Sequence, residues 1–89
     1  MHMENVRMFI LESCPYCKQA LRWMNELLCE NEQYRQIKIE VIDENDQPDL
    51  AYSLDYYYVP TYYIGNEKLH EGAASKDKVR RVLQTALEG

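Results

Sequence analysis

Apolar and polar residues follow one another along the chain with two different periodicities. Residues 6–11 form a short run rich in apolar and β-favouring side chains, which predicts a largely buried strand. After Pro15, apolar residues recur at three- and four-residue steps, which predicts an amphipathic helix ending between residues 29 and 32. Pro15 suits the first helical position, where its missing N–H would have no intrahelical partner. The apolar stripe of this helix consists of Cys17, Ala20, Leu21, Met24, Leu27 and Leu28.

The next segment changes to a two-residue periodicity. Apolar and polar residues alternate over residues 37–42, which predicts a strand with one face more buried than the other. After a polar loop, residues 48–54 predict a short helix, with Pro48 in its first turn and Asp46 or Gln47 as its cap. The apolar residues on the more buried face of the strand are expected to be Ile37, Ile39 and Val41.

The last third of the chain predicts a hairpin and a helix. Residues 61–64 and 67–71 flank Gly65 and Asn66, a two-residue loop of the kind that joins antiparallel strands. Ser75 is a good N-cap for the final helix. The apolar positions of that helix are spaced for one buried face and are Val79, Val82, Leu83, Ala86 and Leu87.

The resulting order, β-α-β-α-β-β-α, predicts an α/β fold with a four-stranded mixed sheet and helices on both of its faces. Eighty-nine residues are enough for one domain, so we expect a single domain over residues 1–89. Residues 1–3 belong to no periodic pattern, and we interpret them as a cloning remnant or a disordered start.

Composition narrows the function classes. The formal net charge of −5 and the pI of about 4.9 argue against nucleic acid as a partner. The apolar runs are far shorter than the ~20 residues that cross a bilayer, and no leader pattern opens the chain. An odd number of cysteines, three, fits a reducing compartment better than a disulfide scaffold. We therefore expect a cytoplasmic monomer that does not associate with membranes.

The strongest chemical signal is Cys14-Pro15-Tyr16-Cys17, located where a strand gives way to a helix. Cys14 should lie beside free backbone N–H groups at the positive end of the helix dipole, which stabilises its thiolate as a nucleophile. Cys17, one turn later, can reach the Cys14 sulfur to close a disulfide, and it should be the less exposed of the two. This asymmetry predicts attack by Cys14 on a substrate disulfide, followed by resolution by Cys17.

The cysteines allow two other interpretations. A zinc site needs four ligands, and the candidates besides the pair are Cys29, His2 and His70, with no second motif, so we expect no metal. Cys29 is fifteen residues after Cys14, about 22 Å along a helix, and is too far away to join the site. We expect it to be a partly buried small hydrophobe, with regulatory oxidation or intermolecular pairing as the alternative.

The motif Cys14-Pro15-Tyr16-Cys17 matches that of dithiol glutaredoxins, and residues 6–87 resemble the glutaredoxin/thioredoxin superfamily. Residues 39–45, 48–51 and 72–76 and the tripeptide Val59-Pro60-Thr61 resemble a thioredoxin in the same order. The resemblance implies a thioredoxin-like fold and a thiol-disulfide oxidoreductase that reduces protein disulfides through Cys14 and Cys17, with no bound cofactor.

The resemblance also implies the surroundings of the cysteines. Pro60 would be a cis-proline beside them, and Pro15 and Tyr16 would support the site. The backbone of Val59 would pair with an extended substrate segment, and Tyr58, Gly72 and Ala73 would also bind the substrate. Of the tyrosines before and after Pro60, we expect alternate members in the core and the rest on the surface, or else Tyr16 and Tyr58 as an aromatic rim.

The chain departs from both parent families. Met8 replaces the buried acid of thioredoxins, Leu11 replaces a basic residue of glutaredoxins, and Ala74 lies in their glutathione-binding stretch. Loss of the basic residue predicts glutathione binding roughly ten- to a hundredfold weaker than in a typical glutaredoxin. Electrons would come from glutathione or from a thioredoxin-reductase-type flavoenzyme, with the second favoured. One alternative is glutathione-dependent monothiol deglutathionylation through Cys14. The other is a non-catalytic module that binds a metal or iron-sulfur cluster, and by the family resemblance Pro15 disfavours cluster binding.

Overall fold

A computed structural model describes residues 5–88, and residues 1–3, assigned above to a remnant or disordered start, lie outside this range. Within it, four strands form one mixed sheet in the order β2-β1-β3-β4. Strand β1 pairs in parallel with β2, and the two other pairings are antiparallel. The elements are β1 Val6–Ile10, α1 Pro15–Glu30, the 3-10 helix η1 Glu32–Gln36, β2 Ile39–Asp43, α2 Pro48–Ser53, β3 Thr61–Ile64, β4 Glu67–Glu71 and α3 Lys76–Glu88.

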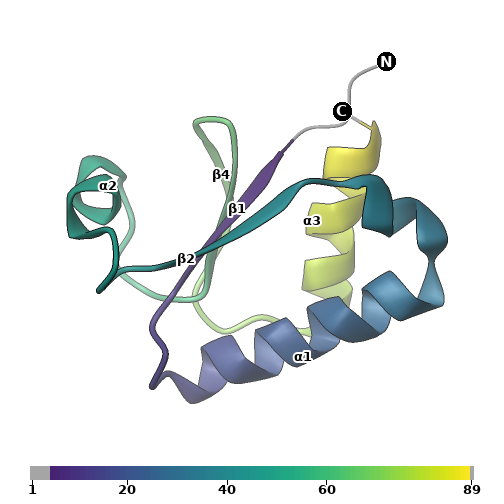
Figure 1. Cartoon of the computed structure of the whole chain (residues 1–89), viewed down its shortest axis with the longest axis horizontal. Helices are drawn as coiled ribbons and strands as arrows, with labels where there is room; N and C mark the ends of the chain where they lie inside the picture. Colours follow the sequence, from purple (N-terminus) through teal and green to yellow (C-terminus); the bar gives the residue numbers. More distant parts are fainter. Residues whose placement is uncertain (1–4, 89) are drawn as a thin grey trace.

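Helices cover both faces of the sheet, as predicted. On one face, α1 and α3 pack over Val6 and Met8 of β1 and over Tyr62 and Ile64 of β3, while the short α2 lies on the other side (Figure 1). There, Phe9, Ile42 and Tyr63 form a second apolar cluster with Leu50, Leu54 and Tyr56. The central strand β1 contributes fully buried residues to both clusters because successive side chains of a strand point to opposite faces.

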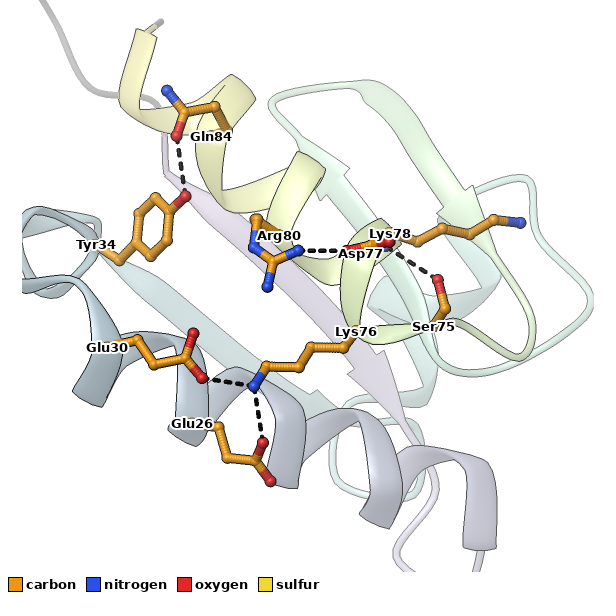
Figure 2. A network of polar contacts seen from close by, with 9 residues as sticks. All are labelled: Glu26, Glu30, Tyr34, Ser75, Lys76, Asp77, Lys78, Arg80 and Gln84. Atoms are coloured by element: carbon orange, nitrogen blue, oxygen red, sulfur yellow. Dashed lines mark hydrogen bonds and ion pairs between the residues drawn. The ribbon is translucent and has the colours of Figure 1, made fainter.

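The hairpin and the last helix begin where the sequence predicts. Gly65 adopts a φ of +60°, which a glycine tolerates, at the turn between β3 and β4. A register irregularity between Tyr62 and Tyr63 then shifts the pairing, so that Thr61 lies opposite Glu71. Ser75 caps α3, since its hydroxyl oxygen accepts a hydrogen bond from the backbone N–H of Lys78 at 3.2 Å (Figure 2).

Polar contacts tie α3 to α1 and to η1. Lys76, at the start of α3, forms ion pairs with Glu26 at 3.0 Å and Glu30 at 2.5 Å, both on α1 (Figure 2). The hydroxyl of the buried Tyr34 in η1 donates a hydrogen bond to the side chain of Gln84 at 2.9 Å. The two long helices therefore meet through both apolar and charged contacts at one end of α1.

Several sequence-based expectations need correction. Val41 is 44% exposed and Ile42 is buried, because β2 is an edge strand whose helix-covered face is not protected along its whole length. Cys29 is exposed rather than partly buried, since its position on α1 faces away from the sheet. Gln47 occupies the N-cap of α2 but makes no side-chain capping hydrogen bond. The 3-10 helix η1 was not predicted.

Candidate active site

The first turn of α1 is built around the sulfur of Cys14. A short turn follows β1, in which the backbone N–H of Cys14 donates to the carbonyl of Leu11 at 3.0 Å. Cys14 then takes the N-cap position with extended backbone angles, φ −82° and ψ 117°. Its sulfur accepts a hydrogen bond from the backbone N–H of Cys17 at 3.4 Å. The sulfur thus takes the capping role that an oxygen usually fills and lies at the positive end of the helix dipole.

The two cysteines differ in exposure and in proton affinity. Cys14 is partly exposed, whereas Cys17 is buried with 1% of its surface accessible. Burial raises the pKa of the Cys17 thiol to about 12, and the neighbouring Cys14 and Glu44 also raise it, against a lowering contribution from the backbone at Leu11. Cys17 is therefore a protonated thiol in the resting protein. Cys14 is the sulfur that a substrate can reach.

A second segment, 45 residues further along the chain, meets the first turn of α1. The thiol of Cys14 lies 3.9 Å from the backbone carbonyl of Val59, which can accept its S–H. The Val59–Pro60 peptide bond is cis, as the resemblance implies, and Pro60 is fully buried. Pro15 and Tyr16, in contrast, are exposed on the helix beside Cys14. The fold thus brings together the predicted residues of the motif and of the Val59–Pro60 segment.

Glu71 anchors the backbone that leads to Pro60, and no sequence pattern described above indicated this role. Its carboxylate accepts hydrogen bonds from the backbone N–H groups of Tyr57 at 2.5 Å and Tyr58 at 2.9 Å, and pairs with Lys68 at 2.7 Å. These contacts lower the pKa of Glu71 to about 2, and the hydrogen bond from Lys68 makes the largest contribution. The carboxylate therefore stays charged and fixes the backbone just before Val59.

Further hydrogen bonds complete this anchorage. The hydroxyl of Thr61 donates to the carbonyl of Tyr58, and the backbone N–H of Gly72 donates to the carbonyl of Pro60 at 2.9 Å. Gly72 has a φ of +90°, a conformation that disfavours other residues, and a side chain there would meet the Cβ of Tyr58 at 3.7 Å. The next residue, Ala73, is exposed, and its carbonyl lies 3.0 Å from a ring nitrogen of His70. Tyr58 and Gly72 therefore lie beside the Val59–Pro60 segment, whereas the contact of Ala73 is with His70.

The tyrosines divide between core and surface without strict alternation. Tyr62 and Tyr63 are buried and Tyr56 is partly buried, whereas Tyr57 and Tyr58 both face solvent. Two consecutive exposed tyrosines arise because residues 55–60 are an irregular loop, to which the two-residue rhythm of a strand does not apply. Tyr16 and Tyr58, the proposed rim, are 60% and 70% exposed.

Among residues 5–88, no group of three or more histidine, cysteine or acidic side chains is arranged to hold a metal ion. Over the same described range, the helices are all too short or too polar to cross a bilayer.

The fold and the cysteine pair define a protein of the thioredoxin-like class. Its fold is similar to the solution structure of oxidised thioredoxin from Plasmodium falciparum, with a TM-score of 0.71 and 14% identity over 94% of this chain and 81% of that one. Thioredoxin from Trypanosoma brucei brucei gives a TM-score of 0.72 at 18% identity, over 98% of this chain and 77% of that one. Glutaredoxin from Brucella melitensis gives 0.54 at 17% identity, over 96% and 84% of the two chains.

The sequence itself assigns the family. The model of the thioredoxin domain family matches residues 4–84, nearly the whole chain, and the protein therefore belongs to this family. No match is found among curated protein sequences. The expected thioredoxin-like fold is confirmed, and the protein belongs to a family of thiol-disulfide oxidoreductases.

Proposed function

We propose that the protein is a dithiol oxidoreductase that reduces protein disulfides through Cys14 and Cys17. One observation carries the proposal: the Cys14 sulfur accepts the backbone N–H of Cys17 at the start of α1, while the Cys17 thiol is buried one turn behind it. The first sulfur is accessible and held where negative charge is favoured. The second is kept from solvent and from external oxidants until Cys14 has reacted.

The chemistry proceeds in two exchanges. The Cys14 thiolate attacks one sulfur of the substrate disulfide, a Cys14–substrate bond forms, and the other substrate sulfur leaves as a thiolate. Cys17 then loses its proton and attacks the Cys14 sulfur, which forms the Cys14–Cys17 disulfide and releases the second substrate sulfur. The two thiolates take up protons from solvent. The substrate gains two electrons, and the cysteine pair supplies them.

The Val59–Pro60 segment supports a strand-like mode of substrate binding. Val59 lies next to the Cys14 sulfur, and Glu71 fixes the backbone that leads to it. An extended substrate segment would pair with the Val59 backbone, a mode that demands little of side-chain identity. Tyr16 and Tyr58, both exposed, would contact apolar side chains on either side of the substrate disulfide.

The electron donor that we favour is a thioredoxin-reductase-type flavoenzyme. Leu11 and Ala74 stand where a charged contact and a backbone contact would hold glutathione in a glutaredoxin, and Leu11 offers no charge. A protein partner that uses backbone pairing at Val59 would not depend on that charge. The proposal includes a cytoplasmic location, since reduced cysteines need a reducing compartment. It also includes a monomer that works without a bound cofactor.

Coupled turnover of a disulfide-bonded protein tests the function and the donor together. In one arm, NADPH and a thioredoxin reductase supply electrons, and in the other, NADPH, glutathione reductase and glutathione do so. We expect NADPH oxidation in both arms to require Cys14, and to be faster in the first arm. Cys29→Ser is the matched control because it makes the same chemical change elsewhere on the same helix.

The assay also separates the alternatives. Turnover only with glutathione, retained in Cys17→Ser, would replace the dithiol proposal by monothiol deglutathionylation. Absence of turnover in both arms, together with visible absorbance of the purified protein beyond the aromatic band, would point to a cluster-binding module instead. A colourless protein that turns over in the first arm supports the proposal.

A further inference from the structure

A cavity lined by three tyrosines lies beside α2. Its volume of about 360 Å³ is within the range of pockets that bind ligands, roughly 300 to 1,000 Å³. Tyr56 forms part of the wall, and its ring packs against that of Phe9 with 5.3 Å between the centroids. Tyr52 and Tyr57, in contrast, are 88% and 85% exposed, so their rings are accessible to a ligand. Exposed tyrosines around a cavity are typical of binding surfaces.

The cavity lies at the same edge of the sheet as the first turn of α1. Because β1 and β2 are parallel, α1 and the loop to α2 both begin at this edge (Figure 1). The carboxylate of Asp43 joins the two segments, since it accepts the backbone N–H of Glu12 at 3.1 Å and that of Asn45, a lining residue, at 2.8 Å. Tyr57 precedes Val59 by two residues, at most about 7 Å of extended chain. A substrate segment beside Val59 would therefore reach the cavity within a few residues.

The segment that builds the cavity is strongly acidic. Residues 39–67 contain seven aspartates and glutamates and no lysine, arginine or histidine, so their formal charge is −7. The whole chain carries −5, and its remaining residues together carry +2. Glu44 brings this negative charge to the cavity wall beside Tyr56, whose pKa is raised by burial and further by the Glu44 carboxylate. The cavity thus combines aromatic faces with a negative charge.

Aromatic faces beside a carboxylate favour a cationic side chain. A guanidinium or ammonium group over a tyrosine ring is attracted by the negative face of the ring. The Glu44 carboxylate, which lines the same cavity, adds a charge attraction. Arginine suits both contacts best, because its planar group stacks on aromatic rings and pairs with a carboxylate through two hydrogen bonds. An acidic side chain would instead be repelled.

We propose that this cavity is a specificity subsite that binds a basic side chain, arginine above all, from the substrate segment that pairs with Val59. The basic residue lies two to four positions from the substrate cysteine, because a strand rises about 3.3 Å per residue and the side chain must reach from Val59 to the cavity at Tyr57. The inference rests on the dithiol function proposed above. It names the class of substrate that the site prefers, a disulfide with a basic residue close to it.

The test compares peptide substrates that differ in one side chain. Two short peptides, each with one central cysteine, are oxidised to their symmetric disulfides. One carries arginine and the other glutamine at the same position, and the position is varied from two to four residues before or after the cysteine. Reduced protein is mixed with each disulfide, the reaction is stopped with acid, and the released thiol peptide is measured by chromatography. No electron donor is present, so binding of a reductase does not affect the result.

The parent should reduce the arginine peptide about fivefold faster than the glutamine peptide at the best position, because an exposed cation–π contact and an exposed ion pair each give a factor of about two to three. Glu44→Gln and Tyr52→Leu should each lower this ratio to about two, whereas Tyr52→Phe, which keeps the ring, should retain it. Glu40→Gln is the matched control: it makes the same change in charge four residues earlier, on β2 and outside the cavity.

The ratio of the two rates removes any effect of a substitution on the cysteines, such as that of Glu44 on the pKa of Cys17, because both peptides meet the same thiols. A ratio near one in the parent at every position would overturn the inference, while release of both peptides would leave the dithiol function intact. A ratio that Glu44→Gln lowers no more than Glu40→Gln does would assign the preference to the overall charge of the chain and would also overturn it. If the parent reduces neither peptide, the dithiol function fails and the inference fails with it.

Discussion

The two ends of α1 carry the same residue type in opposite environments. At the first turn, the sulfur of Cys14 accepts a backbone N–H and Cys17 is buried beneath it. At the last turn, Cys29 is exposed and lies near the carbonyl end of the helix, where the dipole disfavours negative charge. One helix thus holds a cysteine that is set up as a nucleophile and another that is not. Position along the dipole, and not the thiol itself, distinguishes them.

The two ends also differ in what faces them. The first turn meets Val59, and Glu71 holds the backbone of Tyr57 and Tyr58 just before it, so a substrate would find an anchored edge beside the sulfur. The last turn is instead anchored to other elements: Glu30 pairs with Lys76 of α3, and Arg35 of η1 donates to the carbonyl of Leu28 at 2.8 Å. One end therefore serves reactivity and the other end serves attachment to the fold.

Replacing Cys14 should have the largest effect. Cys14→Ser removes the only sulfur of the pair that a substrate can reach, because Cys17 is buried and protonated at neutral pH. We expect reduction of protein disulfides to be abolished in the coupled assay, with the far-ultraviolet circular dichroism unchanged. Turnover that persists above a few percent would mean that another thiol attacks, and the contrast between the two ends of α1 would lose its functional meaning.

Replacing Cys17 should stop the reaction halfway. Cys17→Ser keeps the Cys14 nucleophile, so the first exchange proceeds, but no second sulfur is present to release the substrate. Mass spectrometry should show the protein plus substrate as a mixed disulfide that a reductant removes, and multiple turnover should cease. Because Leu11 supplies no charge for glutathione, this variant should also be weak with glutathionylated substrates. Rates like those of the parent at millimolar glutathione would contradict the dithiol assignment.

The elements around α1 show how far sequence reasoning extends. The hairpin bounds, the cap at Ser75 and the apolar face of α3 could be predicted because local turn chemistry and the 3.6-residue period act within a few residues. The exposure of Val41 could not, since it depends on which strands lie at the edge of the sheet. The exposure of Cys29, in contrast, follows from the helical period, because Cys29 continues the polar face of Arg22 and Asn25, and the expectation of partial burial overlooked this.

The candidate site divides in the same way. Cys14 and Cys17 are recognisable as a local motif, and Pro60 through resemblance, but Glu71 was missed although its hairpin register gave a partial signal. Counting back from the turn at Gly65 places Glu71 opposite Pro60, and the irregularity in the ladder places it opposite Thr61.

Loosening the segment that faces the first turn should have an intermediate effect. Glu71→Ala removes the acceptor for the N–H groups of Tyr57 and Tyr58, and we expect a loss of about 1 kcal/mol in unfolding free energy, since the carboxylate is partly exposed and screened. The folded-state pKa of Glu71, about 2, lies below its ordinary value of 4.5. Its contribution is therefore complete above about pH 4.5 and is lost as the pH falls towards 2.

Urea denaturation of Glu71→Ala and of the parent at several pH values measures this contribution. The difference between their midpoints should be constant from neutral pH down to about 4.5 and should shrink towards pH 2. Glu67→Ala, at the exposed start of the same strand, is the matched control. A difference that does not change with pH would show that the ionised carboxylate does not hold the segment, and the anchored edge beside Cys14 would need another explanation.

Replacing Cys29 should have the smallest effect. Cys29→Ser exchanges an exposed thiol for a hydroxyl of similar size, on the last turn of a helix and about 22 Å along it from Cys14. Turnover in the coupled assay should stay within experimental error, and the unfolding free energy should change by less than about 0.5 kcal/mol, as for other surface substitutions.

In the reduced parent, iodoacetamide should modify Cys14 before Cys29 at neutral pH, because a backbone N–H is directed at the sulfur of Cys14, at the positive end of the helix dipole. Equal alkylation rates, measured by peptide mass spectrometry, would show that the position of Cys14 on the helix gives it no advantage, which would remove the physical basis for the contrast between the two ends.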